Sequence, residues 1–264
     1  MAPDAPEMRA APARVAVVTG ASTGIGRAIA VAFGGLGWTV GVGARRLAQL
    51  DETANLVAGA GGTPLVHPLD VTDPASIDTF CNFVHSHAGA VQVLVNNAGT
   101  ALLGAIHEMS DEDDRRIVET NLLGPMFLTR RVVAQLRNDA IPGDIVFISS
   151  DATVQKRPHL ASYLSTKAGI EAYAQTLALE SEGVGVRSSV VRVGPTLTGF
   201  ADDWDLEVFD YLMPRWQRFG IQRHFDTLAP EDVARAVVTV VTAPPHMWLP
   251  IVEVQPNPPL DPPT

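Results

Sequence analysis

Tyr163 and Lys167 stand four residues apart in Ala161–Glu180, a segment whose sequence predicts a helix. This spacing places both side chains on one helix face, one turn apart. A nearby ammonium group favours a phenolate, so we expect Lys167 to lower the pKa of Tyr163 from the usual value of about 10. The pair could then exchange a proton with a carbonyl or alcohol oxygen. The same spacing is common on solvated helix faces, which is the alternative interpretation of these two residues alone.

A glycine-rich stretch, Gly20–Gly26, follows a short β-branched run that predicts a strand, Arg14–Thr19. A pattern typical of a helix continues from it through Leu36. Glycines allow the backbone to turn sharply and approach a pyrophosphate, and the following helix presents free N–H groups and the positive end of its dipole. An ordinary glycine-rich turn is the alternative, but the position between the first strand and the first helix favours a nucleotide site.

The end of the second predicted strand, Thr39–Gly43, indicates which nucleotide binds. A carboxylate at this position would bind the ribose 2′-hydroxyl of NAD. The sequence instead has Ala44 followed by Arg45 and Arg46, and guanidinium groups pair well with phosphate oxygens. We therefore expect NADP as the cofactor in preference to NAD. The alternative is a solvated helix start, although an Arg there opposes the helix dipole.

The overall composition argues against several classes of partner. The 264 residues carry a net charge of −10 without a block of basic residues, which disfavours nucleic acid or an anionic membrane surface. The single cysteine, Cys81, permits no intramolecular disulfide, and no apolar run reaches the length of a membrane span. His85 and His87 are two apart on a predicted helix and face different directions, so no metal site is expected. These features predict a cytoplasmic protein.

Predicted strands and helices alternate along the chain. Strands are expected at 14–19, 39–43, 63–69, 91–95, 144–149, 186–193 and 248–254, and helices from the glycines to 36 and at 45–58, 73–87, 110–137, 161–180 and 230–241. Such alternation produces a parallel sheet with helices on both faces, so the fold class is α/β. Residues 14–255 are expected to form one domain, between a disordered leader at 1–13 and a Pro-rich tail at 256–264.

Several motifs occur in one order along the chain, and together they resemble the classical short-chain dehydrogenase/reductase family. The resemblance covers about Arg14 to Val254 and rests on the glycine turn Thr19–Gly26, Asp70-Val71, Asn96-Asn97-Ala98-Gly99, Asn121 within Thr120–Gly124, Ser149-Ser150, and the pair Tyr163 and Lys167. Ser150 lies thirteen residues before Tyr163, the usual gap in that family. The chain departs from the family pattern at Val193, where a proline is usual, at Thr23, where many NADP-binding members have a base, and in a C-terminal strand without the usual glycine-rich ending.

The resemblance implies a Rossmann-like, doubly wound parallel sheet of about seven strands in the order 3-2-1-4-5-6-7. It implies hydride transfer between NADP and a carbonyl or secondary alcohol. Tyr163 would act as acid and base, and Lys167 would also hold the nicotinamide ribose. Ser150 would donate a hydrogen bond to the substrate oxygen, and Asn121 would anchor a water in a proton relay. The implied assembly is a homodimer or homotetramer. The implied cofactor contacts are Gly20, Ser22, Thr23, Gly24, Ile25, Gly26, Arg45, Arg46, Asp70, Val71, Asn97, Ala98, Gly99, Tyr163, Lys167, Gly194, Pro195, Thr196 and Thr198.

Residues 199–227 follow the sixth predicted strand, where the family has a lid over its substrate. The stretch contains seven of the sixteen aromatic residues: Phe200, Trp204, Phe209, Tyr211, Trp216, Phe219 and Phe225. An amphipathic helix pair that packs on the core would explain most of these rings, and an apolar mouth for a bulky hydrophobic ketone or alcohol is the more specific interpretation. Ala152, His159, Phe200 and Trp204 are the predicted substrate contacts, and an exposed loop histidine is the alternative for His159.

Two other functions are compatible with such a fold. An epimerase or dehydratase of the extended branch would be expected to have a longer chain and another glycine spacing. A nucleotide-sensing regulator without turnover is the second alternative. Such regulators tend to lack the Tyr or the Lys, and all four catalytic positions are present in this sequence.

Overall fold

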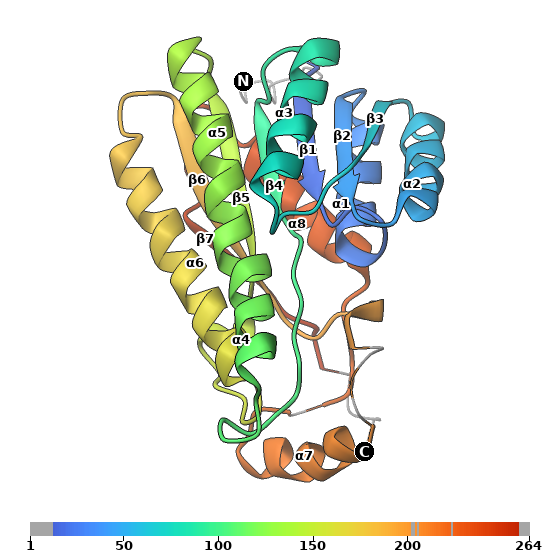
Figure 1. Cartoon of the computed structure of the whole chain (residues 1–264), viewed down its shortest axis with the longest axis vertical. Coiled ribbons are helices and arrows are strands. Elements are labelled where there is room, and N and C mark those ends of the chain that lie inside the picture. Colours follow the sequence, from blue (N-terminus) through green and yellow to red (C-terminus); the bar gives the residue numbers. More distant parts are fainter. Residues whose placement is uncertain (1–12, 202–203, 205, 223, 259–264) are drawn as a thin grey trace, which may run out of the picture.

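The computed structural model describes residues 13–201, 204, 206–222 and 224–258 of the 264-residue chain. Residues 1–12 of the expected leader at 1–13 and residues 259–264 of the Pro-rich tail at 256–264 therefore lie outside the described residues. Between them the chain forms a seven-stranded sheet with helices on both faces (Figure 1). None of the helices in this described part is long and apolar enough to cross a membrane.

The strands are near-continuous apolar runs, because a parallel sheet is buried on both faces. They are β1 (Val15–Thr19), β2 (Thr39–Ala44), β3 (Thr63–Pro68), β4 (Val93–Asn96), β5 (Gly143–Ser150), β6 (Val186–Val193) and β7 (Ile251–Val254). All neighbours pair in parallel, in the predicted order β3-β2-β1-β4-β5-β6-β7. The chain order reverses between β1 and β4, and open α/β sheets bind their ligands at such a point, beyond the carboxyl ends of the strands.

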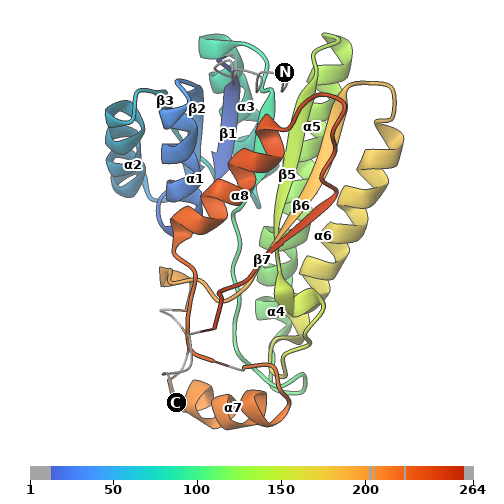
Figure 2. The same ribbon diagram turned by 180° about the vertical axis from the view of Figure 1, so that it is seen from behind.

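Two apolar clusters lie on opposite faces of the sheet. Successive residues of β1 point to opposite sides, so Ala16 and Val18 join one cluster and Val17 joins the other. The helices over the first face are α1 (Gly24–Gly35), α2 (Leu47–Gly59) and α8 (Pro230–Thr242), and those over the second are α3 (Pro74–Ala88), α5 (Gly124–Asn138) and α6 (Ala161–Glu180). Figures 1 and 2 show these layers from opposite sides.

Two helix starts form as the sequence predicts. Asp73 Oδ1 accepts a hydrogen bond from the backbone N–H of Ala75 at 2.9 Å, at the start of α3. Ser110 Oγ accepts one from the N–H of Asp113 at 3.1 Å, at the start of α4 (Asp111–Val118). These side chains satisfy N–H groups that have no partner within the helix, so they define where each helix begins.

The predicted helix at 110–137 is not continuous. It consists of α4, a π-helical turn η1 (Glu119–Leu123) and α5. Pro125 has no N–H and cannot donate to the carbonyl of Asn121 four residues earlier, which disfavours a regular α-helix at this point. The side chain of Asn121 bonds to both backbone groups of Thr100, accepting from its N–H and donating to its carbonyl, each at 2.8 Å. The wide turn therefore joins this helix to the loop after β4.

Three other element starts differ from the prediction by two or three residues. The fourth strand begins at Val93 and not at Val91. Arg46 has an extended backbone, so α2 begins at Leu47 and not at Arg45. The last strand begins at Ile251 and not at Trp248. Trp248 is nevertheless held beside β6, because its indole N–H donates to the carbonyl of Ser188 at 2.8 Å.

In its described part, the segment 199–227 contains one α-helix, α7 (Leu206–Arg218), and a short 3-10 turn, Gly199–Ala201, in place of the predicted helix pair. Figure 1 shows α7 outside the two layers, at the end of the molecule. Its buried residues Leu212 and Trp216 pack with Leu160 and Tyr163 in a third apolar cluster. Trp204, Phe209 and Trp216 therefore pack with the start of α6 and not on either face of the sheet, whereas Phe219 and Phe225 are exposed.

Candidate active site

The four predicted catalytic residues lie together beyond the carboxyl ends of the strands. Ser150 ends β5, Asn121 lies in η1, and Tyr163 and Lys167 are in the first two turns of α6. Each is at most 9% exposed. A Cβ built on Gly99 would lie 3.4 Å from Asn121 Oδ1 and 3.6 Å from Lys167 Nζ, so the loop after β4 touches both helices.

Tyr163 is a neutral phenol in the structure. Burial raises the pKa of Tyr163 to about 12, against the opposing effect of a hydrogen bond from Ser150. Lys167 Nζ lies 5.7 Å from the centroid of the Tyr163 ring. The predicted lowering of this pKa by Lys167 is therefore wrong for the structure described, because desolvation of the phenolate is the larger effect.

Lys167 is buried as well, and it is anchored through its ammonium group. Nζ donates a hydrogen bond to the carbonyl of Ile148 in β5 at 2.8 Å. Burial lowers the pKa of Lys167 to about 8, and the charge of Glu171, one helical turn further on, opposes this effect. The charged form of Lys167 thus depends on a carboxylate that the sequence did not single out.

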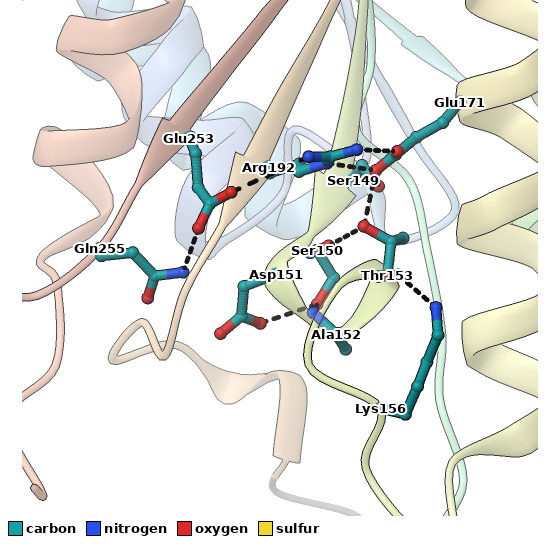
Figure 3. A network of polar contacts seen from close by, with 10 residues as sticks. All are labelled: Ser149, Ser150, Asp151, Ala152, Thr153, Lys156, Glu171, Arg192, Glu253 and Gln255. Carbon is teal, nitrogen blue, oxygen red and sulfur yellow. Dashed lines mark hydrogen bonds and ion pairs between the residues drawn. The ribbon is translucent and has the colours of Figure 1, made fainter. Parts of the chain in front are cut away.

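Glu171 is the centre of a polar network (Figure 3). It accepts hydrogen bonds from Ser149 Oγ at 2.7 Å, Thr153 Oγ1 at 2.9 Å, and two nitrogens of Arg192 at 3.0 and 2.7 Å. Burial alone would raise the pKa of Glu171, but the hydrogen bonds from Arg192, Ser149 and Thr153 together lower it. The network joins α6 to the ends of β5 and β6. Its signal in the sequence was an acid four residues after Lys167.

The glycine turn has the geometry that a pyrophosphate requires. Gly20 and Gly24 have φ angles of 64° and 54°, and a Cβ on Gly26 would lie 2.3 Å from the carbonyl oxygen of Gly20. Thr23 caps α1 without a side-chain hydrogen bond, and the first turn contains no acid. The N–H groups at the start of α1 are therefore left for an external anion. These residues fit the phosphates of a dinucleotide cofactor.

The loop after β4 holds the glycine turn in place. Thr19 Oγ1 accepts hydrogen bonds from the N–H groups of Asn97 and Ala98, each at 3.0 Å. The amide of Asn97 donates to the carbonyls of Thr19 at 2.8 Å and Gly20 at 3.3 Å. The ends of β1 and β4 are thus fixed to one another at the switch point of the sheet.

Cationic side chains surround the same turn. Arg46 donates to Ser22 Oγ at 3.3 Å and Thr23 Oγ1 at 3.2 Å, and both Arg45 and Arg46 are exposed. Arg27, which the sequence analysis did not select, donates to the carbonyl of Ser22 at 2.6 Å. The structure therefore brings Arg46 to the phosphate-binding turn.

The remaining predicted cofactor contacts follow β3 and β6. Asp70 Oδ1 accepts from the N–H and hydroxyl of Thr72 at 2.9 and 2.7 Å, which forms the turn after β3, and Val71 is buried next to it. After β6, a Cβ on Gly24 would lie 3.3 Å from the side chain of Thr198. Thr198 thus reaches the glycine turn. Gly194, Pro195 and Thr196 lie between β6 and Thr198, and Ile25 packs on the first face of the sheet.

Aromatic rings extend from Tyr163 toward α7. The Phe200 ring lies 5.8 Å from the Tyr163 ring, and the Trp204 ring lies 6.4 Å from Phe200. Trp204 also donates from its indole N–H to the carbonyl of Ala101 at 3.3 Å. Ala152 is buried in the same cluster. Of the predicted substrate contacts, Phe200 thus lies beside the phenol of Tyr163, and Ala152 lies in the same apolar cluster as Tyr163.

His159 is half-buried, in contrast to the exposed loop histidine considered as its alternative. Its backbone has a φ of 67°, its carbonyl accepts from the N–H of Gly104 at 3.0 Å, and its ring lies 6.2 Å from that of Tyr211 in α7. Nδ1 is buried and has no hydrogen-bond partner within the part of the chain that the structure describes. His159 thus lies in the loop before α6, between α7 and the loop after β4.

A cavity of about 370 Å³ adjoins Trp204 and the loop after β4. Its lining combines the apolar residues Leu102, Leu103, Met109 and Trp204 with the charged residues Glu108, Asp113 and Arg116. It lies next to the aromatic rings that continue to Tyr163. The arrangement can therefore hold a molecule with a large apolar part near the catalytic groups.

Asp151 and Arg157 form a buried ion pair next to Ser150 that the sequence analysis did not predict. Their contacts are 2.7 Å between Nη1 and Oδ1 and 2.8 Å between Nη2 and Oδ2. An acid directly after Ser150 was a visible feature, but its partner six residues later falls in an irregular loop. Its pairing could not be derived from periodicity.

Known proteins with the same features are numerous. The short chain dehydrogenase family matches residues 14–207. The 3beta-hydroxysteroid dehydrogenase 1 of Eggerthella lenta is 31% identical over 229 residues, which are 84% of each chain. The glycine betaine reductase of Emericella nidulans is 31% identical over 246 residues, which are 92% of this chain and 19% of that much longer protein. A solved actinorhodin polyketide ketoreductase variant with NADPH has a TM-score of 0.80 at 29% identity, over 92% of this chain and 96% of that one.

The family match spans well over half of the chain, and the fold agrees with it. The chain belongs to the short-chain dehydrogenase family, and it is an oxidoreductase of that class.

Gly26→Ala is expected to weaken NADPH binding by more than about tenfold, which corresponds to about 1.4 kcal/mol. The added Cβ would lie 2.3 Å from the Gly20 oxygen and 2.5 Å from Asn97 Nδ2, so the turn must move. Cofactor fluorescence titration measures the change. Gly35→Ala in the same helix is the matched control, because a Cβ there has no neighbour within 4 Å among the described residues. Equal affinity in both variants would contradict the assigned turn.

Lys167→Met is expected to increase the free energy of unfolding near pH 7 by on the order of 1–3 kcal/mol. The pKa of Lys167 is about 8 in the fold, against 10.5 as its ordinary value. Between pH 8 and 10.5 the unfolded wild-type chain binds more protons than the folded one, so the free energy of unfolding of the wild type rises with pH. The stability advantage of Lys167→Met over the wild type therefore shrinks across this range. Urea unfolding from pH 7 to 10.5 measures this, with exposed Lys156→Met as the control. If the difference in free energy of unfolding between Lys167→Met and the wild type did not change with pH, the lowered pKa of Lys167 would be contradicted.

Proposed function

We propose that the chain is an NADP-dependent oxidoreductase that interconverts a hydrophobic ketone and the corresponding secondary alcohol. One observation carries the proposal. A buried, protonated phenol, Tyr163, has the Ser150 hydroxyl near enough to lower its pKa, and it faces the aromatic ring of Phe200. A proton donor and a second hydroxyl thus meet at an apolar surface, which is what reduction of a hydrophobic carbonyl requires.

The roles follow from the geometry of the four residues. Tyr163, with a pKa of about 12, holds its proton at neutral pH and can give it to the oxygen of a carbonyl during reduction. Ser150 can donate a hydrogen bond to the same oxygen as negative charge develops there. Lys167 holds positive charge near the phenol, which opposes the cost of forming the phenolate. Asn121 holds the loop after β4 against the site and is proposed to anchor a relay water.

The cofactor supplies the hydride when it is bound. The glycine turn, Arg45 and Arg46 are proposed to hold NADP in preference to NAD, because two exposed guanidinium groups and no carboxylate follow β2. The actinorhodin polyketide ketoreductase, solved with NADPH, supports this choice. Thr198, which touches the turn, and Lys167 are proposed to contact the cofactor as well.

The substrate class follows from the surroundings of Tyr163. Phe200, Trp204 and the apolar lining of the adjoining cavity suit a bulky hydrophobic molecule. The relative from Eggerthella lenta is named for a 3beta-hydroxysteroid, which is such a molecule. Ala152 and His159 are proposed to form the edge of the same site.

The assembly and the location are proposed on more general grounds. A net charge of −10 disfavours nucleic acid as a partner. We propose a homodimer or homotetramer in the cytoplasm, in line with the family. Light scattering of the purified chain measures the mass of the assembly, and a monomer would contradict this part.

The chain is expected to reduce bulky hydrophobic ketones with NADPH at a kcat/KM at least about tenfold above small polar carbonyls. The decrease in NADPH absorbance across a carbonyl panel measures this. Tyr163→Phe should lower kcat by orders of magnitude while NADPH still binds, because only the proton donor is lost. Turnover that survives in Tyr163→Phe would contradict the mechanism. Cofactor binding without turnover of any carbonyl would favour the sensor alternative.

The ratio of kcat/KM with NADPH to that with NADH is expected to exceed one, and Arg46→Ala should lower it by about tenfold. The substitution removes a charge-assisted contact to the 2′-phosphate, worth about 1.5–3 kcal/mol. Arg235→Ala on the exposed face of α8 is the control for a general loss of positive charge. A wild-type preference for NADH would refute the cofactor assignment.

A further inference from the structure

Asp151 and Arg157 form an ion pair that is almost completely removed from solvent. Their side chains are 5% and 9% exposed, and the guanidinium bonds to both carboxylate oxygens. Removing one partner of such a pair leaves an uncompensated charge in the interior, which is costly. An ion pair exposed to solvent could hold this loop without the cost of burying two charges. The burial of the Asp151–Arg157 pair beside Ser150 therefore calls for a functional explanation.

The Ser150 hydroxyl has one hydrogen and two acceptors within reach. It donates to Asp151 Oδ1 at 3.3 Å, and the second possible acceptor is the Tyr163 phenol, whose pKa the Ser150 hydroxyl lowers. The N–H of Ala152 donates to the Ser150 oxygen at 3.2 Å. An unpaired carboxylate would hold the hydroxyl hydrogen more strongly than a carboxylate already bonded to Arg157. Arg157 thereby leaves this hydrogen available to Tyr163 and to a substrate oxygen.

We propose that Asp151 and Arg157 are positioning residues for the reaction: together they orient the Ser150 hydroxyl and balance the charge beside Tyr163. The proposal rests on the function proposed above, because Ser150 and Tyr163 are its reacting groups. Asp151 begins the 3-10 turn after β5, and Arg157 lies in the loop that leads into α6. The pair therefore also joins the two segments that carry the reacting groups.

The two charges act on Tyr163 in opposite directions. Burial raises the pKa of Tyr163 most, the Asp151 carboxylate raises it further, and the Arg157 guanidinium lowers it. Lys167 faces the ring from its own helix, with Nζ 5.7 Å from the centroid. The lid contributes the uncharged ring of Phe200. With both partners present their effects partly cancel, and the loss of either leaves a net charge that is poorly screened.

The test replaces the partners separately and together, as Asp151→Asn, Arg157→Gln and the double variant. The chain is labelled with 3-fluorotyrosine, whose ring fluorine makes the phenol more acidic, and the Tyr163 signal in ¹⁹F NMR is assigned with Tyr163→Phe. We expect Asp151→Asn to lower the ionisation midpoint and Arg157→Gln to raise it, each by about one pH unit. The double variant should return close to the wild-type midpoint, and Arg157→Lys, which keeps the charge, should remain near it.

Kinetics separate this proposal from the proposed function. With a ketone that the wild type reduces, Arg157→Gln should lower kcat at least about tenfold with little change in KM, since the group acts through Ser150 and not on substrate binding. The two single variants could show opposite midpoint shifts while the wild type turns over no carbonyl. That result would support the role of the pair and refute the proposed function. Midpoints that shift in the same direction, or not at all, in variants with wild-type NADPH affinity would overturn the pair. If one single variant does not fold, the other decides: a midpoint shifted in its expected direction supports the pair, and an unshifted midpoint overturns it.

Discussion

The candidate site depends on buried charges that compensate one another. Burial lowers the pKa of Lys167 and the charge of the nearby Glu171 opposes this effect, and the Asp151 carboxylate is paired with the Arg157 guanidinium at 2.7 Å. An unpaired charge in such surroundings costs several kcal/mol, so the loss of Asp151 or Arg157 would leave its partner as an uncompensated buried charge. The phenol at the centre, Tyr163, takes its proton affinity from this balance and from its own burial.

The polar network around Glu171 also connects the site to the end of the sheet. Arg192 lies 3.9 Å from Glu253 in β7, and Gln255 donates to Glu253 at 3.0 Å (Figure 3). A Cβ on Gly194 would lie 2.3 Å from the Gln255 side-chain oxygen, so the chain after β7 packs directly on the loop that leads to Thr198. The last strand thus supports both α6, which carries Tyr163 and Lys167, and the loop that leads to Thr198, although it follows them by many residues.

The sequence predicted the features that depend on local chemistry. The strand order, the caps at Asp73 and Ser110 and the family were all confirmed. What it missed depends on three-dimensional surroundings. The pKa of Tyr163 was expected to fall because its neighbour Lys167 was visible, whereas the depth of burial was not. Partners that meet across loops leave no periodic pattern. The break in the helix at 110–137 did have a local signal, because Pro125 lies inside the predicted helix.

The wide turn at Glu119–Leu123 is equivalent to one residue inserted into a regular helix. Each residue of an α-helix turns the chain by about 100°, so a deletion here would rotate all of α5 about its axis. Leu128, Val132 and Leu136, which fill the core beneath the sheet, would then face elsewhere. The same deletion would withdraw Asn121 from the loop after β4. Both the packing of α5 and the contacts of Asn121 therefore depend on the number of residues in this turn. We expect the turn to tolerate substitutions far better than insertions or deletions.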